Sequence, residues 1–384
     1  MIAINNPEDC CGCTACYSIC PRDAIIMKPD TLGFVYPQID EEKCIDCGLC
    51  DNVCSFNDKY DISQNFDIPM AYAARHKDIM EVMKSRSGAA FAAISDYILD
   101  MGGVVYGAGY KNHFQVVHKK ASSKCERDEF RGSKYVQSCL EGIFRDVKSE
   151  LMKGTLVLFS GTPCQAAGLK SYIGGNLNNH LYLVDIICHG VPGPLYWKDF
   201  ISYIEKKRKS RLTFVDFRDK DLYGWTNHKE TFKFDNDENK VSFKFPYYNH
   251  VSFRYSCNVC HYTNLKRPSD ITLGDYWGWE RTDSSINKDD KGCSLVLCNT
   301  EKGLQLFEAI KDKMQVVPAD LKNIMQTHLS RPVGIHPQRA IFEEAYAKHG
   351  FEYAIQIVGL AGWRFYLKYY KHKIRTLLNK YRSM

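Results

Sequence analysis

The 384-residue sequence contains no apolar run close to the roughly 18 residues that a membrane-spanning helix needs. Its first residues, Met1 to Asp9, have neither the basic start nor the long apolar segment of a secretion signal. The first absence argues against a membrane-spanning helix, and the two together predict a cytoplasmic protein.

The charge distribution also lacks the broad basic face that nucleic-acid binding requires. The formal net charge is +6, but residues 361–384 alone contain seven Lys and Arg residues and no Asp or Glu. The rest of the chain is close to neutral, which argues against nucleic acid as a partner. From Trp363 to Tyr381, apolar residues recur every three or four positions, which predicts a basic amphipathic helix. Such a helix suits either an anionic lipid surface or packing on the body or a partner.

What the chain has in excess is cysteine, with 17 residues, most of them in tight groups. In a reducing cytoplasm, such groups indicate metal and not disulfides. Residues 10–20 and 44–54 both read Cys-x2-Cys-x2-Cys-x3-Cys, offset by 34 positions, so they form an internal repeat. This spacing is typical of paired [4Fe–4S] clusters, in which the last cysteine of each run ligates the other cluster.

The repeat predicts two sets of ligands. The cluster-one set is Cys10, Cys13, Cys16 and Cys54, and the cluster-two set is Cys44, Cys47, Cys50 and Cys20. A pair of zinc sites is the alternative, but zinc usually takes two separated pairs of ligands. Cys11 is an additional thiol that we interpret as a bystander. Gly12 and Gly48 are expected to let the backbone approach the clusters closely.

An α/β core with additional β structure should follow the repeat. We expect a ferredoxin-type domain over residues 1–56, a linker over 57–69, a core over 70–335 and a basic helical extension over 336–384. Apolar patterns indicate alternating strands and helices in the core and mainly strands later, which predicts a mixed sheet. Strands are expected over 32–40, 70–75, 103–106, 114–119, 155–159, 181–187, 271–273 and 294–298, with more between 212 and 245; helices are expected over 87–99, 139–152, 165–172 and 195–207.

Further cysteines should meet at one edge of the core sheet. One follows the strand over 155–159 and another follows the strand over 181–187. A short helix joins these strands, so they should be parallel neighbours whose carboxyl ends lie at the same edge. With a later Cys-x2-Cys pair they provide four thiols for a third [4Fe–4S] cluster. This core set is Cys164, Cys188, Cys257 and Cys260.

Two alternatives for these cysteines remain open from spacing alone. Cys257 and Cys260 could bind zinc together with Cys293 and Cys298, as two pairs of ligands. Alternatively, Cys164 could be a nucleophile at a helix N-terminus, activated by a neighbouring histidine.

The motifs around these cysteines resemble those of the beta-subunit family of coenzyme F420 hydrogenases and dehydrogenases. The chain is similar to the bacterial branch with a fused N-terminal ferredoxin, over about residues 1–345. The segments that carry the resemblance are Arg-Gly-Ser-Lys-Tyr-Val-Gln (131–137), Ser-Gly-Thr-Pro-Cys-Gln (160–165), Asp-Ile-Ile-Cys-His-Gly (185–190), Ser-Cys-Asn-Val-Cys (256–260) and Asp-Ile-Thr-Leu-Gly-Asp-Tyr-Trp-Gly (270–278).

The resemblance implies a core that binds FAD beside a [4Fe–4S] cluster, for which the core set provides the matching cysteines. FAD binding maps onto residues 85–90, at the start of a helix, where the family usually has two glycines and this chain has Gly88-Ala89. Arg131 and Lys134 suit a pyrophosphate or an anionic substrate, or else lie in a solvated loop. The expected cofactor-binding residues are Ser87, Gly88, Arg131, Ser133, Lys134, Tyr135, Thr162 and Asp275, and the candidate catalytic residues are His189 and Lys134.

Together these features predict an iron–sulfur flavoprotein oxidoreductase. Clusters carry single electrons whereas an organic bond needs a pair, so a flavin is the natural converter between them. A ferredoxin or a redox partner subunit is the expected electron-exchange partner. One alternative is an electron-relay subunit without substrate chemistry, and another is a metal-stabilised binding protein without flavin.

Overall fold

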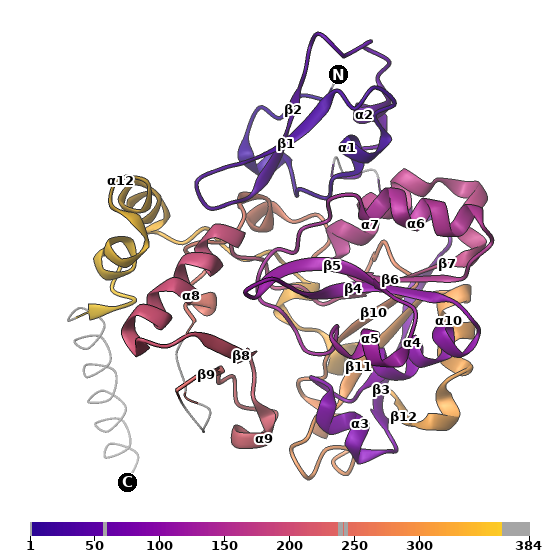
Figure 1. The fold of residues 1–384 in the computed structure, drawn as a ribbon. Coiled ribbons are helices and arrows are strands. Elements are labelled where there is room, and N and C mark those ends of the chain that lie inside the picture. The colour runs from indigo at the N-terminus through magenta and orange to yellow at the C-terminus, as the bar shows by residue number, and fades with distance from the viewer. Residues whose placement is uncertain (1, 57–59, 237–240, 242–244, 363–384) are drawn as a thin grey trace.

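The computed structural model describes residues 2–56, 60–236, 241 and 245–362. Its N-terminal part is a small unit that lies against a larger body (Figure 1). The unit contains an antiparallel strand pair, and each half of the cysteine repeat contributes one short helix. These elements are β1 (Ile25–Pro29), β2 (Val35–Ile39), α1 (Ala15–Ile19) and α2 (Leu49–Asn52).

Within the described residues, the body is built on an eight-stranded mixed sheet with the order β12-β3-β11-β10-β7-β6-β4-β5. The central strands β4, β6, β7 and β10 are parallel neighbours, and the outer strands pair antiparallel. The strands are β3 (Asn65–His76), β4 (Val104–Lys111), β5 (Gln115–Ala121), β6 (Val157–Gly161), β7 (Leu181–Ile186), β10 (Ile271–Asp275), β11 (Ser294–Thr300) and β12 (Met314–Pro318). The predicted α/β class with a mixed sheet is confirmed.

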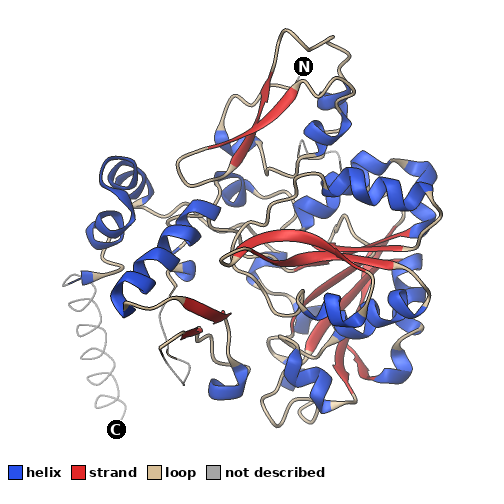
Figure 2. Ribbon diagram, in the orientation of Figure 1, coloured by secondary structure: helices blue, strands red, loops and turns tan. Residues whose placement is uncertain are grey.

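Helices cover both faces of this sheet (Figure 2). On β6, Val157 and Phe159 join the core on the side of α6 and α7, whereas Leu158 joins the core on the side of α4 and α10. This alternation is the period-two pattern of a strand buried on both faces. The helices are α4 (Ala90–Asp100), α5 (Lys124–Asp128), α6 (Ile143–Met152), α7 (Pro163–Ile173) and α10 (Glu301–Glu308).

A second, aromatic core lies beside the sheet, among α8, α12 and a small strand pair. Trp197 and Phe200 on α8 stack at 5.8 Å between ring centroids and pack on Phe245. Phe34 of the N-terminal unit belongs to the same core, so apolar burial joins the two parts. The elements are α8 (Pro194–Arg208), β8 (Leu212–Asp216), β9 (Thr231–Phe234) and α12 (Arg339–Ile357); α3 (Ile79–Lys84), α9 (Lys220–Tyr223) and α11 (Leu321–Ile324) complete the body.

Several boundaries differ from the sequence prediction. β3 begins at Asn65, so residues 65–69, predicted as irregular linker, are strand. The segment 212–245 contains the helix α9 between its strands. α6 begins at Ile143 and not at 139, because Gly142 has a left-handed φ of 78°. The predicted tail helix from Trp363 to Tyr381 lies outside the described residues.

β6 and β7, the two strands that are followed by core cysteines, are parallel neighbours as predicted. Val157 lies opposite Leu181, and Gly161 lies opposite Asp185. In the described part of the chain, no helix has both the length and the hydropathy of a membrane span.

Candidate functional site

The cluster-one set comes together where the N-terminal unit meets the body. Cys13 and Cys16 are buried, and Cys10 and Cys54 are half-buried. Burial raises the pKa of the Cys16 thiol, and the neighbouring thiols of Cys13, Cys10 and Cys54 raise it further. The four thiols of this set are therefore near enough to interact electrostatically, and the predicted exchange of the fourth cysteine stays a prediction.

The cluster-two set lies at the outer end of the same unit. Cys20, Cys44, Cys47 and Cys50 all line one small hollow. Cys47 is exposed and the other three are half-buried. This set is therefore the most accessible of the three.

The core set meets at the carboxyl edge of the parallel strands. Cys164 is the second residue of α7, directly after β6, and Cys188 follows the end of β7. Cys257 and Cys260 come from a 3-10 turn over Tyr255–Val259 and its C-cap. All four line one cavity of about 360 Å³.

The four thiols of the core set also interact electrostatically. Burial raises the pKa of Cys188, and the charges of Cys257, Cys164 and Cys260 raise it further. Burial likewise raises the pKa of Cys257 to about 12, with Cys260 and Cys164 contributing. Thiolates gathered in this way need a cationic centre, and an all-sulfur donor set fits an iron–sulfur cluster.

The alternative pairing with Cys293 and Cys298 does not occur. Cys293 packs in the core that includes Tyr276, whereas Cys298 packs on the opposite face of the sheet against Phe307. Neither lines the cavity of the core set. Across the described ranges, no three His, Cys, Asp or Glu side chains are close enough to hold a single metal ion. Zinc on these two pairs is therefore contradicted.

Cys11 is more than the bystander that the sequence indicated. It is buried, belongs to the same apolar cluster as Cys13 and lines the cavity of the core set. Its interaction with the thiols of Cys13 and Cys164 raises the pKa of Cys11, and the same interaction lowers the pKa of Cys164 to about 7. Cys11 thus lies between the cluster-one set and the core set.

Cationic side chains line another wall of the core cavity. Arg86 forms an ion pair with Asp216 at 3.3 Å, but its Nε has no hydrogen-bond partner. Arg218 pairs with Asp275 and donates to the Trp225 carbonyl at 2.9 Å, and its Nε is likewise unpaired. Buried, unpaired guanidinium nitrogens are costly unless an anion completes them, so this wall fits the phosphates of a nucleotide cofactor.

Arg131 and Lys134, the two cations predicted to meet a pyrophosphate, differ in whether a carboxylate neutralises their charge. Arg131 lines the cavity, but its guanidinium pairs with Glu81 at 2.7 Å and with Asp128 at 2.7 Å. The ammonium of Lys134 donates to the carbonyls of Glu129 at 2.6 Å and Arg131 at 3.0 Å and lies over the Tyr110 ring at 5.6 Å, and it forms no ion pair among the described residues. Lys134 is therefore better suited than Arg131 to meet an anion.

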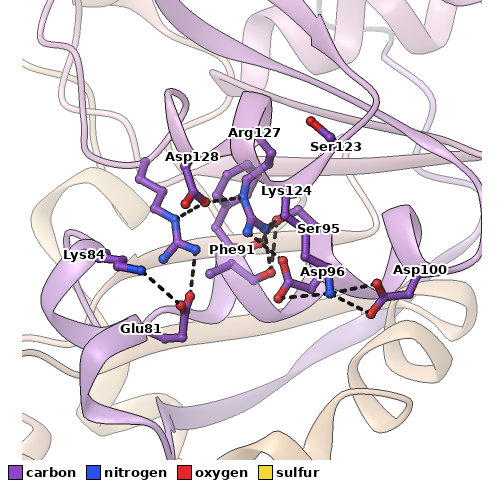
Figure 3. A network of polar contacts seen from close by, with 12 residues as sticks. Glu81, Lys84, Phe91, Ser95, Asp96, Asp100, Ser123, Lys124, Arg127 and Asp128 are labelled. Carbon is purple, nitrogen blue, oxygen red and sulfur yellow. Dashed lines mark hydrogen bonds and ion pairs between the residues drawn. The ribbon is translucent and has the colours of Figure 1, made fainter.

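A polar network holds the loop that carries these two cations (Figure 3). Arg127 is buried and pairs with Asp96 at 2.6 Å and with Asp128 at 3.1 Å. It also donates to the Ala92 carbonyl at 2.9 Å, so α5 is fastened to α4. These contacts hold the end of α5 in place, and with it the start of the loop over residues 128–134.

The predicted FAD segment lies at the start of α4. Ser87 lines the cavity and donates to the Cys293 carbonyl at 2.6 Å. Gly88 lies behind it, where a Cβ would come within 2.2 Å of the Ala74 carbonyl oxygen. Ala89 has a φ of 67°, a left-handed conformation that glycine adopts more easily. A second glycine at this position, as the family usually has, would adopt this left-handed conformation without strain. In this chain Ala89 adopts it instead, at some cost in backbone strain.

Aromatic rings and a carboxylate complete the cavity wall. Asp275, Trp277 and Tyr135 line it, whereas Tyr276 alternates to the opposite side and is buried there. Burial would raise the pKa of Asp275, but the charge of Arg218 and its hydrogen bond outweigh burial and lower it. Trp277 stacks on Trp225 with 4.6 Å between ring centroids.

His189 lines the cavity beside the core set, within a group of histidines. Its Nε2 lies 2.7 Å from Nε2 of His250, and its ring is 3.9 Å from that of His328. Burial, together with the charges of His328 and His250, lowers the pKa of His189 to about 3. His189 is thus neutral near pH 7, and its role as a proton donor stays a prediction.

Several cavity residues were not predicted from the sequence. Ser133 and Thr162 line the cavity, and so does Arg86, which lies inside the predicted FAD segment 85–90. Arg218 and His228 also line it and were not predicted, and Gln137 belongs to one of the family motifs but was given no role. Arg218 and His228 come from the irregular segment around α9, where no motif marks them.

The α/β fold and the paired cysteine repeat define the class of this chain, an iron–sulfur electron-transfer protein. Residues 9–57 match the 4Fe-4S dicluster domain, and residues 154–323 match the C terminus of the coenzyme F420 hydrogenase/dehydrogenase beta subunit. Along the chain, a segment that matches the dicluster domain is therefore followed by one that matches the C terminus of that beta subunit, as the motifs predicted.

Two known proteins illustrate the similarity. Over 50 residues, 13% of this chain, the sequence is 38% identical to an uncharacterized ferredoxin of Methanocaldococcus jannaschii. The match covers 64% of that ferredoxin, so the chain spans less than two thirds of this relative. A chain of the F420-reducing [NiFe] hydrogenase complex from Methanosarcina barkeri matches with 17% identity and a TM-score of 0.47, covering 77% of this chain and 93% of the other.

Proposed function

We propose that this protein is an iron–sulfur flavoprotein oxidoreductase that accepts single electrons at its surface and delivers pairs of them to an organic substrate. The observation that carries the proposal is the order of the three cysteine sets. The cluster-two set is the most accessible, the cluster-one set lies deeper, and the core set lines the cavity.

The cluster-one set and the core set are joined through a single helix, α7. Gly168 packs so closely on the cluster-one cysteine Cys13 that a Cβ would lie 2.7 Å from its Sγ. Cys164, one helical turn earlier, belongs to the core set. Cys11 packs in the same apolar cluster as Cys13 and lines the same cavity as Cys164. The two sets are thus within one turn of helix of each other, which suits electron transfer between them.

The cavity supplies the place for a flavin and its substrate. Arg86, Arg218 and Lys134 would hold the phosphates of FAD, with Ser87 at the start of α4. Tyr135 and Trp277 offer aromatic surfaces for a flat ring or a substrate. When bound, FAD would supply the conversion between single electrons and electron pairs.

The surface around the cluster-two set is the proposed contact for a redox partner. Ile45 is 61% exposed and Leu49 is 42% exposed, beside Cys47. Exposed apolar residues around an accessible set of thiols suit a transient protein contact. A ferredoxin or a partner subunit is the proposed donor or acceptor, in a reducing compartment that keeps the thiols free.

Flavin reduction through the core set tests this proposal. The wild-type protein, purified without oxygen, should contain FAD that is rapidly reduced by a reduced ferredoxin in stopped-flow absorbance at the flavin band. Cys188→Ser should keep FAD but slow its reduction by at least about tenfold, because the path through the core set is interrupted. Cys125→Ser removes an exposed cysteine on α5 and is the matched control.

The same measurement distinguishes the flavoprotein proposal from the alternative, an electron-relay subunit without substrate chemistry. Clusters without bound flavin, and without turnover of any small molecule, would overturn the flavoprotein proposal in favour of a relay. Unchanged flavin reduction in Cys188→Ser would remove the core set from the electron path.

A further inference from the structure

Arg254 is a buried cation that crosses from the body into the N-terminal unit. Its side chain is 1% exposed. The guanidinium donates to the Cys10 carbonyl at 2.7 Å and to the Val35 carbonyl at 2.9 Å, and one nitrogen lies 3.6 Å from the Cys10 sulfur. On the other side, the Arg254 carbonyl accepts a hydrogen bond from the Cys257 N–H at 3.0 Å. Arg254 also lines the core cavity. It therefore lies between the cluster-one set and the core set.

Arg254 forms no ion pair with a carboxylate in the part of the chain that the structure describes, and the Asp30 carboxyl interacts with its charge only at longer range. Its remaining polar partner is the amide oxygen of Gln137 at 3.1 Å, and its guanidinium lies over the rings of Tyr36 at 4.3 Å and Phe34 at 5.3 Å. By contrast, the buried cations Arg218 and Arg267 each pair with an aspartate. A buried charge without a counter-ion is strongly unfavourable, so the surroundings of Arg254 call for an anion.

The position of the guanidinium is fixed from several sides. Gly12 has a φ of 70°, and a Cβ there would come within 2.8 Å of an Arg254 nitrogen. Gln137, which accepts from Arg254, donates to the Cys11 carbonyl at 2.9 Å. These contacts hold the charge against the loop that carries Cys10 and Cys13, and they leave no room for it to turn away.

We propose that Arg254 sets the reduction potentials of the two clusters between which it lies, on the cluster-one set and on the core set. An iron–sulfur cluster on four thiolates is anionic, and each electron that it accepts from a one-electron donor adds negative charge. A fixed neighbouring cation favours the reduced form, because net charge and hydrogen bonds near the sulfurs set the potential. Arg254 is thus a positioning residue for electron transfer. The inference rests on the proposed function, since it requires clusters on both sets.

Potentiometric titration of the full-length protein with dithionite, followed by electron paramagnetic resonance, tests this role. Arg254→Met removes the charge and keeps the bulk of the side chain. It should shift two of the three cluster midpoints to lower potential by at least about a tenfold change in the reduction equilibrium, which is about 59 mV for one electron. The third midpoint, of the cluster-two set, should stay unchanged. Arg254→Lys keeps the charge and should retain most of the wild-type potential.

Arg145→Met is the matched control. Arg145 also joins the body to the N-terminal unit, through the carbonyls of Ser18 and Tyr17 at 3.1 Å, but its charge pairs with Asp23 at 2.6 Å. Its removal should leave all three midpoints in place. Gln137→Glu is a second variant that keeps the arginine and sets a carboxylate beside it. It should lower the same two midpoint potentials. If Arg254→Met does not fold, this variant alone tests whether the charge of Arg254 sets them.

The results separate the inference from the function on which it rests. Wild-type potentials in both Arg254→Met and Gln137→Glu, with the clusters present, would overturn the role of Arg254. An equal shift in Arg254→Lys and Arg254→Met would also overturn it, because packing and not charge would then be responsible. Wild-type protein without reducible clusters would instead refute the proposed function itself.

Discussion

At the scale of single residues, the cations of the cavity differ in how their charge is compensated. Arg131 and Arg218 have carboxylate partners, whereas the hydrogen bonds that the described residues offer to Lys134 are to backbone carbonyls. Burial therefore lowers the pKa of Lys134 to about 7. The ammonium is protonated below that pH and loses its charge as the pH rises through it, so an anion bound beside it should hold the proton in place.

We therefore expect FAD binding to weaken with rising pH. If the bound phosphates keep Lys134 protonated, the affinity of the flavin-free protein for FAD should fall up to about tenfold per pH unit above pH 7. Fluorescence titration between pH 6 and pH 8.5 measures this. Lys134→Arg should remove the dependence, because a guanidinium stays charged throughout this range. The same pH slope in Lys134→Arg and in the wild type would assign the effect to another group.

At the scale of elements, the ends of β6 and β7 explain why two of the core cysteines could be predicted. Each is preceded by a short apolar run, and a short helix between parallel strands brings their carboxyl ends together. The sequence could not show how the later Cys-x2-Cys turn reaches this edge. Arg267 links the segment that follows this turn to the sheet edge, because its guanidinium donates to the Tyr262 carbonyl, to Asp185 on β7 at 3.0 Å and to the Ile186 carbonyl at 3.0 Å.

Breaking this buried pair should release the turn that carries Cys257 and Cys260. Asp185 and Arg267 have side chains 0% and 1% exposed, so Asp185→Asn leaves a buried cation unpaired. We expect a loss of about 3–5 kcal/mol in stability, measured by urea unfolding without oxygen. Lys348→Ala, which removes an exposed pair with Glu344, is the control and should cost less than about 1 kcal/mol. Equal midpoints for both variants would contradict the role of the pair.

At the scale of the whole molecule, the spacing of the cysteines predicted the cluster sets of the N-terminal unit but not its docking. Cys11, Gly168 and Arg254 are far apart in the sequence, and no periodic pattern marks them as neighbours. They meet because Phe34 of the unit is buried in the aromatic core of the body and α1 lies against α7. Arg218 and His228 from the segment around α9 were missed for the same reason, since their place in the cavity arises only from the assembled fold.

The iron content of the anaerobically purified protein tests the central claim most directly. Three cubane clusters predict about twelve iron atoms per wild-type chain, and Cys257→Ser should contain about eight, with Cys125→Ser still at about twelve. Reduction should produce paramagnetic signals from three clusters in the wild type and from two in Cys257→Ser. About eight iron atoms in the wild type, or an unchanged content in Cys257→Ser, would contradict a cluster on the core cysteines.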